Sequence, residues 1–180
     1  LSLWFAEVLD TYRMLASYYV EARKRRNESI QQLKFPFLFR PGQKKLTAIA
    51  YRAMEEKKHI FLQAPTGVGK TISTLYPALK ELGEEKAENI FYLTAKTITR
   101  TVAEDTVRLL KKQGLYLSSV VITAKEKICI QEEMQCNPDK CKRAAGHFDR
   151  INEALYALLN AEVAINRENI LLYAEKYSFI

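Results

Sequence analysis

The sequence predicts an α/β fold whose parallel sheet begins within residues 36–124. Three short apolar segments, residues 59–63, 90–94 and 119–123, are predicted strands, and helical patterns separate them. A glycine-rich loop follows the first segment and leads directly into a helix. Strands that alternate with helices of about 10–15 residues are typical of βαβ units, which place their strands in one parallel sheet.

The first predicted helix, residues 3–33, rests on apolar residues that recur every three or four positions. The basic run at residues 23–26 within it is either a solvated helix face or a patch that contacts phosphate. Pro36 and Pro41 then predict an extended connector before the second helix, residues 43–57.

Glycines bound the next two helices. The third predicted helix starts near Lys70 and ends around Gly83, and the fourth, residues 99–112, ends before Gly114. Residues 125–150 carry all three cysteines and seven Lys, Arg and His residues, with no strand signal. Helical spacing returns at residues 151–164, so we expect a small cysteine-bearing insert that is mainly helical.

Composition limits the class of protein. The 180 residues are 48% hydrophobic and 27% charged, which predicts a globular chain. The uncharged runs are too short for a transmembrane helix, and the start lacks signal-peptide features, so we expect no membrane partner and a cytoplasmic setting. The net charge of +7 permits a polyanionic partner. The chain starts at Leu1 and stops on an apolar end, which suggests a fragment of a longer protein.

The glycine-rich loop has the pattern of a phosphate-binding loop. Gly67 and Gly69 let successive N–H groups point at phosphates, and the helix after them adds its positive N-terminal end. Lys70 can reach the β- and γ-phosphates, and the Thr71 hydroxyl can bind Mg²⁺, so these two are the candidate catalytic residues. The whole candidate nucleotide site comprises Arg40, Gln43, Ala64, Pro65, Thr66, Gly67, Val68, Gly69, Lys70 and Thr71.

Two further motifs accompany the loop. Gln43, with Arg40 before it, could hydrogen-bond an adenine edge, although a plain helix-capping turn is the alternative. Thr94, Lys96 and Thr97 offer hydroxyls and a cation suited to strand phosphates, although a polar loop is the alternative. Together these motifs resemble superfamily 2 helicases.

The cysteine spacing resembles one branch of that superfamily. Cys129, Cys136 and Cys141 follow the third predicted strand, as in the iron–sulfur insert of bacterial XPD/DinG-type DNA helicases. Four thiolates hold a 4Fe–4S cluster in that family, so the fourth ligand is expected beyond Ile180. A Cys₃His zinc site completed by His147 is one alternative, and three free thiols are the other.

The resemblance implies an incomplete RecA-like domain at residues 35–124, after an N-terminal helix or connector at 1–34 and before an incomplete iron–sulfur insert at 125–180. It implies an ATP- and Mg²⁺-dependent helicase that acts in DNA repair or replication. Such an enzyme moves along single-stranded DNA, with 5′-to-3′ polarity, and parts duplex junctions. No second ATPase motif or second motor domain is found, so we expect these residues alone to be inactive. The alternatives are a phosphate-loop ATPase with no DNA role and a zinc-binding nucleic-acid module.

Overall fold

The computed structural model describes residues 2–161 and 164–178, apart from the side chain of Thr97. The chain forms two compact units, Leu1–Leu117 and Ser118–Ile180. The first unit contains α1 (Ser2–Gln32), α2 (Gln43–Glu55), α3 (Lys70–Gly83) and α4 (Thr97–Lys112). The second contains α5 (Lys125–Ile128), α6 (His147–Asn160) and α7 (Arg167–Tyr177).

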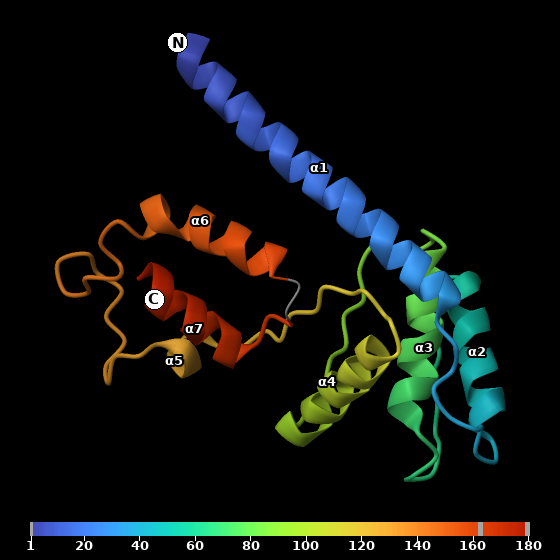
Figure 1. Cartoon of the computed structure of the whole chain (residues 1–180). Coiled ribbons are helices and arrows are strands. Elements are labelled where there is room, and N and C mark those ends of the chain that lie inside the picture. Colours follow the sequence, from blue (N-terminus) through green and yellow to red (C-terminus); the bar gives the residue numbers. More distant parts are fainter. Residues whose placement is uncertain (1, 162–163, 179–180) are drawn as a thin grey trace. The chain divides into compact units, whose positions relative to one another are not determined.

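The core of the first unit lies where α3 packs between the other helices. In Figure 1 the last turns of α1 lie beside α3, and α2 runs along another side of α3. Gly83 permits the close approach of α1, because a Cβ at this position would overlap the Ile30 side chain. The buried cluster consists of Ile30, Leu33, Ile72, Leu79, Leu82, Leu110 and Leu115.

The basic run of α1 helps to hold this helix in place. Arg23 Nε lies 3.0 Å from Glu85 Oε1, and the Arg25 guanidinium lies 4.2 Å from the centre of the Tyr116 ring. Ser29 adds hydrogen bonds with the backbone of Tyr116. Two of the four basic residues therefore pack α1 against its own unit. The apolar side of the earlier turns is exposed, with Trp4 62% accessible.

The predicted parallel sheet is wrong. Within residues 2–161 and 164–178 there is no β-strand, and an isolated parallel bridge joins Val120 to Ile165. Apart from that bridge, the predicted strand segments have no regular secondary structure, and their apolar side chains are largely exposed, with Phe61 98% and Leu93 88% accessible. An apolar run favours extended backbone, but a strand forms only when a neighbour pairs with it. In this chain the helices pack directly on each other, and the core forms without a sheet.

The second unit is organised by its two longer helices. Ala154 of α6 and Ala174 of α7 are buried together, and Ile151, Tyr173 and Tyr177 pack around them. The Asn166 side chain caps α7 by accepting a hydrogen bond from the Asn169 amide at 3.0 Å. Because small residues meet at this contact, the two helix backbones come close together.

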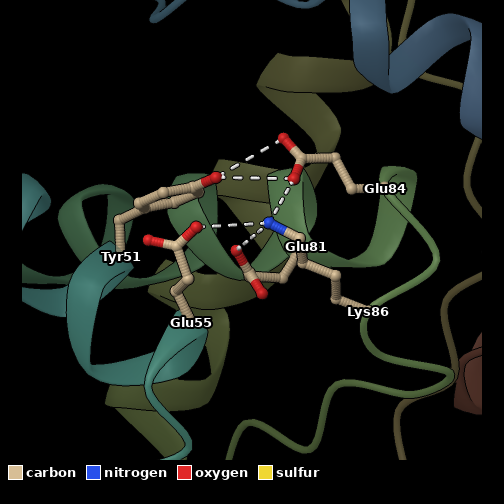
Figure 2. A network of polar contacts seen from close by, with 5 residues as sticks. All are labelled: Tyr51, Glu55, Glu81, Glu84 and Lys86. Atoms are coloured by element: carbon tan, nitrogen blue, oxygen red, sulfur yellow. Dashed lines mark hydrogen bonds and ion pairs between the residues drawn. The ribbon is translucent and has the colours of Figure 1, made fainter.

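A polar network lies on the surface of α2 and α3 (Figure 2). The Lys86 ammonium lies 2.8 Å from a Glu84 carboxylate oxygen, 3.4 Å from Glu55 and 3.9 Å from Glu81. Tyr51 donates to Glu84 at 3.4 Å. The Glu81 carboxylate is buried, with its side chain 6% exposed, and its Oε1 has no hydrogen-bond partner. Lys86 therefore supplies the positive charge that faces a buried carboxylate.

We expect Lys86→Met to lower the midpoint of urea denaturation at pH 7, because Glu81 then stays buried without a cation. The hydrogen bond from Lys86 lowers the pKa of Glu84. The stabilisation by this pair is therefore present above the unfolded-state pKa of about 4.3 and is lost as the pH falls through the lower folded-state pKa. The difference between wild type and variant should shrink as the pH approaches about 3.

Lys58→Met is the matched control, because Lys58 pairs at 2.7 Å with Glu56, whose side chain is 43% exposed. Its removal should hardly change the midpoint, since surface ion pairs contribute little. Equal losses in the two variants at pH 7 would contradict a special role for Lys86.

Candidate functional site

The glycine-rich loop lies between an extended segment and the start of α3. Gly67 and Gly69 both have left-handed backbone conformations, with φ of +82° and +83°. Such conformations carry little strain for glycine, and they turn the loop into the helix. Because α3 begins at Lys70, the positive end of its dipole faces the loop. The local geometry is that of an anion-binding site at a helix N-terminus.

The two candidate catalytic residues occupy the first turn of this helix. The Lys70 ammonium donates to the carbonyl oxygens of Ala64 and Pro65, both at 3.0 Å. The Thr71 hydroxyl oxygen accepts a hydrogen bond from the Tyr92 hydroxyl at 3.4 Å. The Lys70 cation is thus folded back over the loop, where it could meet a phosphate group.

Arg40 and Gln43 lie against the same loop. Gln43 is 2% exposed, and its Oε1 accepts a hydrogen bond from the Arg40 amide at 3.0 Å. The Arg40 guanidinium donates to the carbonyl oxygen of Gly67. A Cβ on Gly69 would overlap the Gln43 amide nitrogen, so the amide packs directly on the loop backbone. The structure therefore brings together the residues that the sequence analysis assigned to the base and to the phosphates.

The donor set near Thr71 suits Mg²⁺ that arrives with a triphosphate. Mg²⁺ is usually bound by one or two protein oxygens together with phosphate oxygens and water. Thr71 supplies one such hydroxyl oxygen, and Lys70 next to it supplies positive charge for the phosphates. The local residues therefore fit binding of a nucleoside triphosphate with its metal.

The candidate strand-contacting segment lies just before α4. Thr94 donates from its hydroxyl to the Lys96 carbonyl at 3.3 Å, which bends the backbone there. Lys96 is exposed, and its carbonyl accepts from the amides of Thr99 and Arg100 in the first turn of α4. Thr97 is the first residue of α4, and its side chain lies outside the described part of the structure.

The sequence analysis missed Tyr92. The signal was the alternation along the extended segment, in which Ile90 packs against the core while Phe91 and Leu93 are exposed. Tyr92, at 37% accessible, is less exposed than either neighbour, and its hydroxyl reaches Thr71.

The cysteine segment lies in the second unit. Cys129 is half-buried, Cys136 is exposed, and Cys141 is buried and accepts a hydrogen bond from Gln131 Nε2 at 3.3 Å. A hydrogen bond with Cys136 raises the pKa of Lys125, and the charges of all three cysteines add to this effect.

These residues do not form a metal site as they are arranged here. Among the described residues, no group of three or more His, Cys, Asp or Glu side chains is placed to hold a metal ion. That finding covers Cys129, Cys136, Cys141 and His147, so neither the iron–sulfur set nor the Cys₃His zinc set is assembled. The fourth thiolate expected for a cluster was predicted to lie after Ile180.

Comparison with known proteins gives one match. The family model described as DEAD/DEAH box helicase matches residues 40–162, which is more than half of the chain. Searches among curated proteins and among solved structures find no match. In the part of the chain that the structure describes, no helix is both long and apolar enough to cross a membrane.

We expect Gly69→Ala to weaken triphosphate binding about tenfold, because its Cβ displaces the Gln43 amide from the loop. Gly42→Ala is the matched control. Gly42 has a similar φ of +77°, but a Cβ there meets no atom within 4 Å. Both variants place an alanine at a positive φ, and only Gly69→Ala also meets Gln43, so it should lose much more affinity in titrations with a fluorescent ATP analogue. Equal losses would mean that strain alone, rather than the contact with Gln43, governs binding.

Proposed function

Because the chain belongs to the DEAD/DEAH box helicase family, we propose that it carries the ATP-binding part of a motor that moves along single-stranded DNA. Family membership indicates ATP-dependent helicase activity on nucleic acid. The preference for DNA, the 5′-to-3′ direction and a role in repair or replication are finer proposals that rest on the resemblance to XPD/DinG-type enzymes. A cytoplasmic setting is a separate proposal.

One observation carries the proposal. Arg40, Gln43 and Lys70, which are up to 30 positions apart in the sequence, all contact the loop at the start of α3. A simple turn would not require the buried Gln43 side chain to pack on Gly69. It would also not require Arg40 to bond to Gly67. This arrangement favours a site that reads a base and binds its phosphates together.

The residues divide the work as follows. Lys70 balances phosphate charge, and the N–H groups of the loop and of the first turn of α3 hold the phosphate oxygens in place. Thr71 would hold Mg²⁺, which when bound neutralises charge between the β- and γ-phosphates. Gln43 and Arg40 would fix the adenine relative to the loop. Thr94, Lys96 and Thr97 would contact strand phosphates, which position a strand without reading its sequence.

We further propose, on the resemblance alone, that Cys129, Cys136 and Cys141 hold a 4Fe–4S cluster with a fourth thiolate. The described residues do not assemble this set, and no step of ATP hydrolysis is assigned to it.

We expect Lys70→Ala to abolish strand-stimulated ATP hydrolysis in the protein made from its complete reading frame, with a loss of at least about a hundredfold. The cause is the loss of the cation beside the transferred phosphate. Lys44→Ala, which removes an exposed lysine from α2, is the matched control and should hydrolyse ATP like the wild type. The measurement is phosphate release with and without single-stranded DNA. Hydrolysis that survives in Lys70→Ala would contradict the proposed function.

Metal analysis of the complete protein, purified without oxygen, tests the cluster. We expect about four iron atoms per chain, and Cys136→Ser should lower the iron content. Zinc in a one-to-one ratio would favour the Cys₃His alternative, and protein free of both metals would contradict either site.

A further inference from the structure

We propose that Tyr92 is a positioning residue that couples the strand-contacting segment at residues 94–97 to the Thr71 hydroxyl of the phosphate loop. This inference rests on the proposed function, because it assumes that residues 94–97 contact a nucleic-acid strand. A nucleic-acid strand bound at residues 94–97 changes ATP binding and hydrolysis through the contact between the Tyr92 and Thr71 hydroxyl groups.

The hydroxyl groups of Tyr92 and Thr71 are in direct contact. The Tyr92 hydroxyl donates to Thr71 Oγ1 at 3.4 Å, although the two residues are 21 positions apart. Oγ1 is also the atom that would bind Mg²⁺. A tyrosine proton and a metal ion therefore draw on the lone pairs of the same oxygen.

A short series of contacts connects Tyr92 to the strand-contacting segment at residues 94–97. Tyr92 is less exposed than Phe91 and Leu93 beside it, and Thr94, two residues further on, donates to the carbonyl of Lys96. The Lys96 carbonyl in turn accepts bonds from the first turn of α4. A strand phosphate that binds at Thr94 or Lys96 would therefore shift the backbone two residues after Tyr92.

The hydrogen bond between Tyr92 and Thr71 is long, and a small displacement changes it. Its length exceeds the usual O–H···O separation of about 2.8 Å, so a displacement of a few tenths of an ångström decides whether the bond is made. Phe91 and Leu93 on either side are exposed, with 76% and 88% of their areas accessible, so this segment is held on one side only. Segments with few buried contacts are the ones that move in response to ligands.

The test uses Tyr92→Phe in the complete protein, since this change removes the hydroxyl and keeps the ring. Two ratios are measured: ATP hydrolysis with and without single-stranded DNA, and the affinity for a labelled strand with and without ATP and Mg²⁺. Coupling between two binding sites is reciprocal, so the affinity ratio reports it without any catalytic step. We expect Tyr92→Phe to reduce both ratios about three- to tenfold.

Tyr76→Phe is the matched control. Tyr76→Phe likewise removes one hydrogen bond, which the Tyr76 hydroxyl donates to the Leu33 carbonyl at 3.1 Å, away from the loop. Tyr76 is half-buried, whereas Tyr92 is 37% accessible. Tyr76→Phe should keep both ratios at the wild-type value. Unchanged ratios in Tyr92→Phe, or equal losses of the basal and stimulated rates, would overturn the coupling. Wild-type protein that ignores the strand altogether would overturn the proposed function and this inference with it.

Discussion

The burial of α3 is the constraint on which the first unit depends. Its apolar side lies in the core with residues of α1 and α4, and its last residue, Gly83, lets α1 approach closely. The same helix begins with Lys70 and Thr71. Because one helix carries both the core contacts and the candidate phosphate-binding residues, packing at its C-terminal end fixes the direction in which its N-terminal end points.

The polar groups around the loop satisfy one another. Arg40 bonds to Gly67, Gln43 accepts from the Arg40 amide, and Lys70 bonds to two loop carbonyls. The bonds to Gly67, Ala64 and Pro65 fix the loop backbone, and the bond between Arg40 and Gln43 holds the Gln43 side chain that packs on Gly69. The pairing of Lys86 with three carboxylates shows the same principle on another face of the unit, where a cation outside the helices compensates a buried acid.

The helices could be predicted because their signals are local. Apolar spacing and flanking glycines gave helices at 70–83 and 99–112, and the structure has α3 and α4 at Lys70–Gly83 and Thr97–Lys112. The sheet prediction failed because a strand needs a partner, and the apolar run around Phe61 carries no information about one. The closeness of Gln43 to Gly69 was suggested only by family resemblance, since contacts across 26 positions leave no periodic signal. The alternation around Tyr92 marks it as less exposed than its neighbours but does not identify Thr71, 21 positions away, as its partner.

The two carbonyl contacts of Lys70 have a consequence for ligand selectivity. An anion that binds the Lys70 ammonium must replace the hydrogen bonds that this ammonium donates to the carbonyls of Ala64 and Pro65. A single small anion gains little binding free energy, because the hydrogen bonds that it forms only replace those that it breaks. A chain of phosphates can form the same bond and, at the same time, reach the loop amides and the Thr71 hydroxyl. If the loop binds phosphates as proposed, we therefore expect it to prefer polyphosphates over orthophosphate, because a ligand must first displace the carbonyls of Ala64 and Pro65 from Lys70.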